Sequence, residues 1–193
     1  MRIFPQKIFS RKAQLILVLC ASVFVGSVIA ADSYGLKIYS ASTQIQESVY
    51  QLDAQLEYAL SQAALDALES GVPLTFELEV DIVQPREWMW NKTISSYDQR
   101  YQVAYHALTQ QYIVTNINSG VQNSYSSRKT ALLTMGRINN YPLIDVNEVK
   151  IRDGYKGRVR ISLLINELPA PMRPWAFINA EWSLTSEWFE WDL

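Results

Sequence analysis

The chain has 193 residues, of which 49% are hydrophobic and 19% are charged, and this globular composition excludes an intrinsically disordered protein. Its length favours one domain that is large enough to bury a core without disulfides or metals. The first 30 residues hold four of the 17 basic side chains and no acidic one, so the rest of the chain carries 13 basic and 19 acidic residues. An acidic domain without a basic run is a poor candidate for binding nucleic acid or for electrostatic docking on anionic lipid.

Residues 1–30 have the pattern of a segment that directs export across a membrane. A basic stretch precedes residues 13–30, which contain no charge, and Val28 and Ala30 stand where a signal peptidase reads small side chains. The pattern predicts either a signal peptide cut directly after Ala30 or an uncleaved N-terminal membrane anchor, since about 20 apolar residues span a bilayer. In both cases residues 31–193 form a single exported domain, which is periplasmic or anchored to the inner membrane through residues 13–30. The basic residues are Arg2, Lys7, Arg11 and Lys12.

The single cysteine, Cys20, lies within this apolar run. A lipoprotein signal would need a small residue directly before the cysteine, and Leu19 stands there instead. If the segment is removed on export, the mature domain has no cysteine. We therefore expect it to fold without a disulfide, although an oxidising compartment would permit one.

Alternation of apolar and polar residues predicts two half-buried strands in the first half of the domain. Residues 50–58 alternate strictly, and residues 74–82 form the most regular strand of the chain. Between them, residues 61–70 predict a short helix with Ser61 as its N-cap and Gly71 as its stop. The inward residues of the second strand are Leu74, Phe76, Leu78, Val80 and Ile82.

Further strands are expected in the second half of the domain. Residues 97–105 and 112–114 predict a hairpin, and residues 159–165 alternate again. Because proline lacks a backbone donor, residues 168–174 are expected to form a rigid extended connection. Residues 181–193, which are rich in tryptophan, are expected to form a last strand.

A second short helix is expected to begin at Ser126 or Ser127 and to carry Leu132, Met135 and Ile138 on its apolar side. Several alternating strands with two short helices predict a mainly β chain, an antiparallel β-sandwich of the immunoglobulin-like kind. The alternative is an α+β fold in which both helices pack on one face of an antiparallel sheet.

Catalytic residues are not evident in this pattern. His106 is the only histidine and falls on the polar side of its strand, and the domain has no cysteine, so a nucleophilic site could only be built around His106. Glu77, Glu79 and Asp81 share one strand face, where neighbouring side chains lie ~7 Å apart, within the range that glycosidases use. A charged face that keeps a half-buried strand soluble is the simpler explanation. We therefore expect no enzyme and no catalytic residue, and an envelope hydrolase with a carboxylate pair is the alternative.

Metal and cofactor sites are not expected either. One histidine and no domain cysteine leave zinc without its usual ligands. Asp145, Asn147 and Glu148 come nearest to a calcium loop, which needs more oxygen ligands in one tight turn. The seven glycines form none of the spacings of a phosphate-binding loop.

The aromatic residues are the richest signal in the chain. Trp88, Met89 and Trp90 follow a strand that Pro85 ends. One interpretation is that the two indoles fill the core at a sheet end, because tryptophan buries a large area. The other is that they form a docking turn, because tryptophan dominates the hot spots of protein interfaces. Three more tryptophans lie near the C-terminus, namely Trp182, Trp188 and Trp191.

Six stretches that are distributed over residues 45–193 give the chain a family resemblance. They are ESGVPLTF (69–76), PREWMW (85–90), YQVAYHALT (101–109), MGRI (135–138), LPAP (168–171) and EWSLTSEW (181–188). In these stretches the chain resembles the bacterial family called domain of unknown function 4390. The resemblance implies an exported protein with a signal segment and a chromosomal neighbourhood shared with a membrane sensor kinase. It implies no known activity and no catalytic residues.

The sequence therefore predicts a non-catalytic interaction or binding module of the bacterial envelope. The expected partner is an envelope or inner-membrane protein, and Trp88, Met89 and Trp90 are the candidate contact residues. Membrane attachment is expected only through an uncleaved N-terminal segment.

Overall fold

The computed structural model describes residues 34–88, 90–148 and 154–193. These residues belong to one compact unit. The predicted export segment and Met89 lie outside the described residues. None of the helices in the described part of the chain is long and apolar enough to cross a bilayer.

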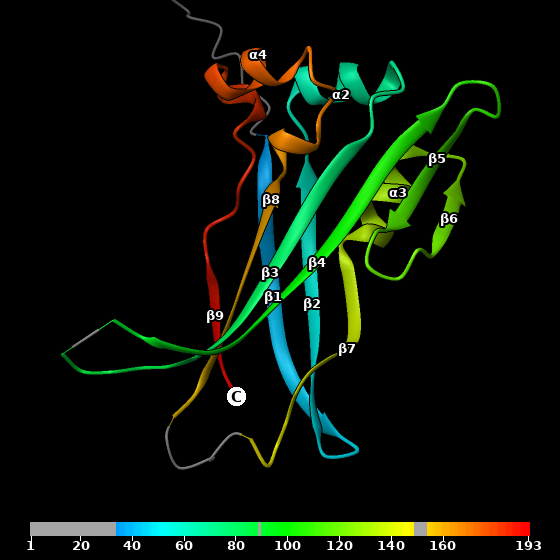
Figure 1. Cartoon of the computed structure of the whole chain (residues 1–193). Helices are drawn as coiled ribbons and strands as arrows, with labels where there is room; N and C mark the ends of the chain where they lie inside the picture. Colours follow the sequence, from blue (N-terminus) through cyan, green and yellow to red (C-terminus); the bar gives the residue numbers. More distant parts are fainter. Residues whose placement is uncertain (1–33, 89, 149–153) are drawn as a thin grey trace, which may run out of the picture. The chain divides into compact units, whose positions relative to one another are not determined.

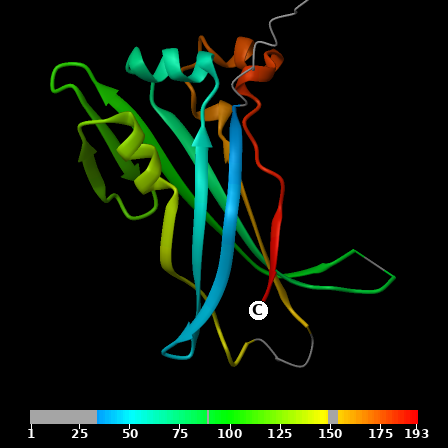
Figure 2. The same ribbon diagram turned by 180° about the vertical axis from the view of Figure 1, so that it is seen from behind.

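Two antiparallel sheets build the domain, and the prediction of a mainly β chain is confirmed (Figures 1 and 2). One sheet has the strand order β1-β2-β7, and the other has the order β6-β5-β4-β3-β8-β9. Consecutive strands β3 to β6 form a meander, because each pairs antiparallel with the next. The strands are β1 (Gly35–Gln46), β2 (Val49–Ala59), β3 (Leu74–Gln84), β4 (Lys92–His106), β5 (Gln111–Asn116), β6 (Gln122–Tyr125), β7 (Arg137–Asp145), β8 (Lys156–Leu163) and β9 (Phe189–Asp192).

The core lies between the sheets and is built on the strict alternation of the predicted strands. Every second residue of β2 is buried, and the five inward residues of β3 are at most 1% exposed. Strand β3 pairs with β4 on one side and β8 on the other, so it lies well inside the larger sheet. Both predicted strands are confirmed with their inward faces as expected.

Trp191 of β9 joins the two sheets at one side. Its indole nitrogen donates a hydrogen bond to Thr43 Oγ1 of β1, with a nitrogen–oxygen distance of 3.3 Å. The ring packs directly on Gly157 of β8, where an added Cβ would lie 2.2 Å from the nearest ring atom. A glycine at this position therefore makes room for the indole between the sheets.

Three α-helices and two 3₁₀ turns are described, at the ends and edges of the sheets rather than across one face. Helices α2 and α4 lie together at one end of the domain, and α3 lies against β5, β6, β7 and β2 (Figures 1 and 2). The helices are α2 (Gln62–Glu69), α3 (Arg128–Met135) and α4 (Arg173–Ile178), and the 3₁₀ turns are η2 (Ile165–Glu167) and η3 (Ala180–Trp182).

The caps of the two predicted helices follow from local chemistry. The Ser61 hydroxyl accepts a hydrogen bond from the Ala64 amide at 3.3 Å, and the Ser127 hydroxyl accepts one from the Thr130 amide at 3.1 Å. Gly71 follows α2 with a φ of +85°, which suits a residue without a Cβ. Both N-caps are as expected.

The expected extent of the second helix is wrong, because Ile138 belongs to β7 and not to α3. Helix α3 ends at Met135, and Gly136 turns the chain so that its carbonyl accepts a hydrogen bond from the Leu56 amide at 2.8 Å. This bond to β2 starts the pairing of β2 with β7, which the sequence had not indicated.

Three expectations about the C-terminal region are also wrong in extent. The stretch 168–174 is not extended throughout, because Arg173 and Pro174 begin α4, where proline's missing donor costs nothing. The strand expected up to residue 165 ends at Leu163, because Ile165 lies in η2. Within residues 181–193 the strand is confined to β9, preceded by a single bridge from Thr185 to Ser162.

Candidate functional site

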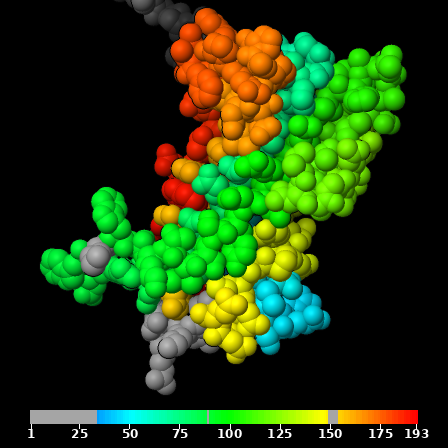
Figure 3. All heavy atoms as spheres, viewed as in Figure 1, coloured from blue at the N-terminus to red at the C-terminus, as the bar shows by residue number. Residues whose placement is uncertain are grey.

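The candidate docking turn lies at the tip of a long hairpin. Strands β3 and β4 stay paired as far as Gln84 and Lys92, so seven residues connect them. Trp88 and Trp90 are each 93% exposed in this connection. The hairpin projects from the body of the domain as a separate arm (Figures 1 and 3). The interpretation that these two indoles fill the core is therefore wrong.

Local sequence explains why the hairpin leaves the sheet. The pairing of β3 with β4 shifts register between Ile82 and Val83, which is the signature of a bulge that bends a strand. Pro85 then ends the ladder because it lacks a donor. Two large apolar side chains remain in solvent with Arg86 and Glu87 beside them. Such exposure of tryptophan is unusual on a soluble monomer and is typical of a contact surface.

The C-terminal tryptophans have a different role from the pair in the hairpin. Trp182 is 3% exposed and belongs to the core, and Trp188 and Trp191 are partly buried against the sheets. These three tryptophans therefore pack within the domain and do not form an exposed docking surface.

The three carboxylates of β3 do share one face, and each contacts an arginine. Glu77 accepts a hydrogen bond from Arg100 Nε at 2.8 Å, and Glu79 accepts one from Arg160 at 2.6 Å. Asp81 accepts two hydrogen bonds from Arg158, at 2.9 and 2.7 Å, and one from the Ser96 hydroxyl at 2.6 Å. Their partners are the residues opposite them on β4 and β8.

The Trp188 ring stacks against two of these arginines. The ring lies 4.4 Å from the Arg158 guanidinium carbon and 4.5 Å from that of Arg160, both measured to the ring centroid. Stacking on an aromatic face favours the two cationic groups. The carboxylates are thus part of a ladder of ion pairs that ties β3, β4, β8 and the C-terminal segment together, an arrangement that favours a structural role.

The other residues considered for chemistry lie apart from one another. His106 is exposed at the end of β4, as expected from its position on the polar side. Asp145 accepts hydrogen bonds from the Asn147 amide and side chain at 2.8 and 2.7 Å, so it closes a local turn. Among residues 34–88, 90–148 and 154–193, no three histidine, cysteine or carboxylate side chains are grouped as metal ligands.

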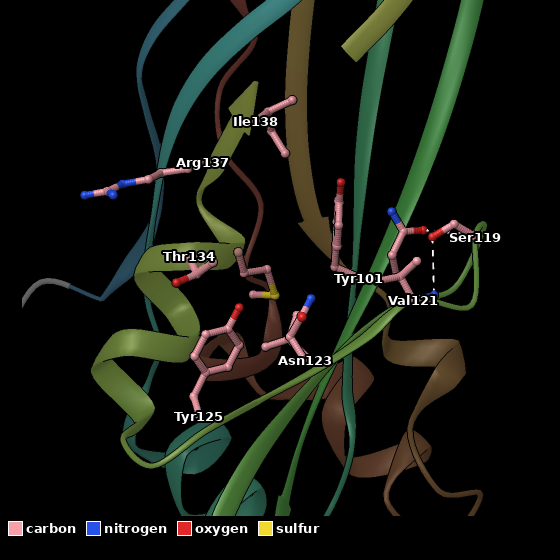
Figure 4. Close-up of a pocket in the computed structure, with 11 residues that line it drawn as sticks. Tyr101, Ser119, Val121, Asn123, Tyr125, Thr134, Arg137 and Ile138 are labelled. Carbon is pink, nitrogen blue, oxygen red and sulfur yellow. Dashed lines mark hydrogen bonds between the residues drawn. The ribbon is translucent and has the colours of Figure 1, made fainter. Parts of the chain in front are cut away.

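The structure also contains a groove that the sequence had not indicated (Figure 4). It has a volume of about 290 Å³ and lies between the β4–β5–β6 end of the larger sheet and the α3–β7 junction. Tyr101, Asn123 and Tyr125 line it from the sheet side, and Arg137 extends away from it. Burial, and to a smaller extent Tyr141, raises the pKa of the Tyr101 hydroxyl, which therefore stays protonated at neutral pH.

Asn116, which also lines this groove, stabilises the adjacent loop. The Asn116 side-chain oxygen accepts hydrogen bonds from the amides of Asn118 and Ser119, both at 3.0 Å, and so shapes the loop at the rim. A second groove of about 280 Å³ runs between the first residues of β1 and residues 186–189. Both grooves are open to solvent, and neither contains a cluster of catalytic side chains.

These features define a small, mainly β domain whose β3–β4 hairpin exposes two tryptophans at its tip. A family model described as "Domain of unknown function (DUF4390)" matches residues 33–192, and the chain belongs to this family. The resemblance noted in the sequence is thereby confirmed. No curated protein and no solved structure has a significant match to the chain.

Proposed function

We propose that this protein is a non-catalytic interaction module of the bacterial envelope that docks a protein partner through its β3–β4 hairpin. The observation that carries the proposal is the exposure of Trp88 and Trp90, each at 93%, at the tip of an arm that makes no other use of them. Burying one tryptophan against a partner removes ~150–250 Å² from water, so two can anchor a small interface.

The surroundings of the two indoles suit a protein partner. Arg86 and Glu87 precede Trp88, and Asn91 and Lys92 follow Trp90, so charges of both signs and a neutral amide surround the aromatic pair. Apolar anchors within a polar rim are the usual anatomy of a protein interface. The family resemblance points to an inner-membrane protein, such as a sensor kinase, as the class of partner.

The proposal includes export of the domain, which can be tested separately. Because a basic stretch precedes the uncharged residues 13–30, we expect a reporter fused after Leu193 to be active only when the reporter works outside the cytoplasm. The N-terminus of the product distinguishes the two forms of the segment, since cleavage yields Ala31 and an anchor leaves the chain intact. A reporter that is active only in the cytoplasm would contradict export.

Docking is tested with the double variant Trp88→Ala/Trp90→Ala of the full chain. Both side chains are exposed, so we expect the thermal unfolding midpoint to stay within about 2 °C of the parent value, as for ordinary surface substitutions. In cells, we expect crosslinks between the protein and an inner-membrane protein to be lost. The measurements are thermal unfolding by circular dichroism and crosslinking followed by mass spectrometry.

Ile45→Ala serves as a matched control, because Ile45 is a 57% exposed apolar residue in β1. This control is expected to keep both its stability and its crosslinks. If the double variant is stable and keeps every crosslink of the parent protein, the hairpin is not the docking site.

A further inference from the structure

A second exposed apolar surface lies on α4, which the sequence had not indicated as a helix. Trp175, Phe177 and Ile178 are 63%, 66% and 76% exposed, although three large apolar residues in one short helix would ordinarily face a core. Ala176 is the buried residue of this helix, at 2% exposure.

The three residues form one continuous face. Successive residues of an α-helix are about 100° apart around its axis, so Phe177, Ile178 and Trp175 follow one another around the helix. The middle of the arc that they cover is opposite Ala176. Because Ala176 faces the domain, the apolar arc faces directly away from it, and we call this arc the α4 face.

Contacts on the inner side hold α4 in place. Arg173 Nε donates a hydrogen bond to the Leu168 carbonyl at 2.7 Å, and the side chain of Leu168 is fully buried. The helix also packs against η2 and η3, where Trp182 belongs to the core. The α4 face is therefore presented by a helix that is packed against the core on its inner side.

The α4 face lies at the end of the domain where the chain enters β1. Helix α4, the first residues of β1 and the turn between β4 and β5 are all at this end in both views (Figures 1 and 2). That turn carries Leu108, which is 99% exposed. The segment around α4 forms the outer surface there (Figure 3).

The distance along the chain from β1 to the export segment is short. Only residues 31–34 separate the uncharged run 13–30 from Gly35, the first residue of β1. Four residues span at most ~14 Å when fully extended. A bilayer that holds residues 13–30 is therefore within reach of this end of the domain.

The stretch that contains α4 carries no negative charge itself, although Glu167 and Glu181 stand directly before and after it, and α2 at the same end carries Asp66 and Glu69. Residues 168–180 contain one arginine and no acidic residue, in a domain whose acidic residues outnumber its basic ones. Tryptophan is enriched where a bilayer meets water, and apolar side chains on a surface helix insert at the same depth.

We propose that the α4 face inserts into the headgroup region of the bilayer that holds residues 13–30, as a second membrane contact beside the N-terminal segment. The contact is apolar and needs no anionic lipid. The inference rests on the export segment remaining uncleaved as a membrane anchor, and it is independent of the hairpin, whose tip lies away from α4 in both views (Figures 1 and 2).

The test uses spin labels on the full chain, reconstituted in vesicles of phosphatidylcholine and phosphatidylethanolamine. In a Cys20→Ser background, single labels are attached at Phe177→Cys and Ile178→Cys, and at Ile45→Cys as a control. Ile45 is also exposed, and it precedes the β1–β2 turn at the opposite end of the domain (Figure 1). The measurement compares the accessibility of each label to oxygen, which partitions into lipid, and to a water-soluble nickel complex.

We expect the ratio of oxygen to nickel accessibility to be several-fold higher at positions 177 and 178 than at position 45. Equal ratios at all three positions would overturn the proposal and leave a protein partner as the occupant of the α4 face. Spin–spin broadening at 177 and 178 would also overturn it, because a second copy of the chain would then cover this face. Neither result bears on the hairpin variants, so failure of this inference and failure of the docking proposal are distinguishable.

Discussion

Replacing Leu78 with alanine is expected to lower the free energy of unfolding by ~2–5 kcal/mol, which is a large part of the stability of a domain of this size. Leu78 is 1% exposed and lies between Phe76 and Val80 on the inward face of β3. Strands β4 and β8 flank it on both sides, so the surrounding backbone has little freedom to close the cavity. Denaturant unfolding followed by tryptophan fluorescence measures the loss.

Glu79→Ala is the matched control on the adjacent position of the same strand. Glu79 points to the opposite face, where its side chain is 24% exposed and pairs with Arg160. Partly exposed ion pairs contribute about 0–1 kcal/mol, so we expect a much smaller loss than for Leu78→Ala. Equal losses in the two variants would mean that the inward and outward faces of β3 are wrongly assigned.

Gly136→Ala is expected to destabilise the domain by ~1–3 kcal/mol, although alanine has the higher helix propensity of the two residues. Gly136 has a φ of −78° and a ψ of −1°, a conformation that alanine adopts without strain. The cost arises from contact, because an added Cβ would lie 2.3 Å from the backbone oxygen of Leu56. A backbone atom cannot rotate away, so β2 and the α3–β7 junction would have to separate.

Thr134→Ala, two residues earlier in the same helix, controls for the change in helix propensity. Its side chain is exposed, so we expect its removal to cost little. We expect Thr134→Ala to leave the unfolding midpoint unchanged or slightly raised. A Gly136→Ala variant that is as stable as Thr134→Ala would show that β2 and α3 do not approach as closely as described.

The two exposed apolar features lie in different parts of the domain. The α4 face is at the end where β1 begins, and the hairpin with Trp88 and Trp90 projects from the region around β9 (Figure 1). With the α4 face on the bilayer, the hairpin would extend into the aqueous space above it. The hairpin would then contact the exported domain of a partner in the aqueous space. The charged residues beside Trp88 suit such an aqueous contact.

Much of the candidate hairpin could be predicted from local sequence, and its exposure could not. Pro85 marked the end of β3, and the pattern of Trp88 and Trp90 stood out in composition alone. Whether the two indoles are buried depends on which other parts of the domain pack against the hairpin. The bulge at Ile82 and Val83 bends the hairpin away from the sheet. The alternation of apolar and polar residues within one strand does not indicate such a bend.

Strand β1 shows a different limit of local pattern. Its inward residues include Leu36 and Ala41, but polar and exposed side chains occupy most of the strand and a register shift interrupts it near Ile38. It holds its place because β2 pairs with it along its whole length and because Trp191 contacts Thr43. The sequence of residues 35–46 by itself indicates neither the pairing with β2 nor the contact with Trp191.

The sequence by itself determined the mainly β class, the faces of β2 and β3, the caps of α2 and α3, and the family. Each of these depends on residues close in the chain, where alternation, hydroxyl caps and glycine act within a few positions. Only the tertiary structure decided that α4 presents an apolar face, that the β3 carboxylates pair with arginines, and that Gly136 must lack a side chain. These features depend on atoms far apart in sequence that the two sheets bring into contact.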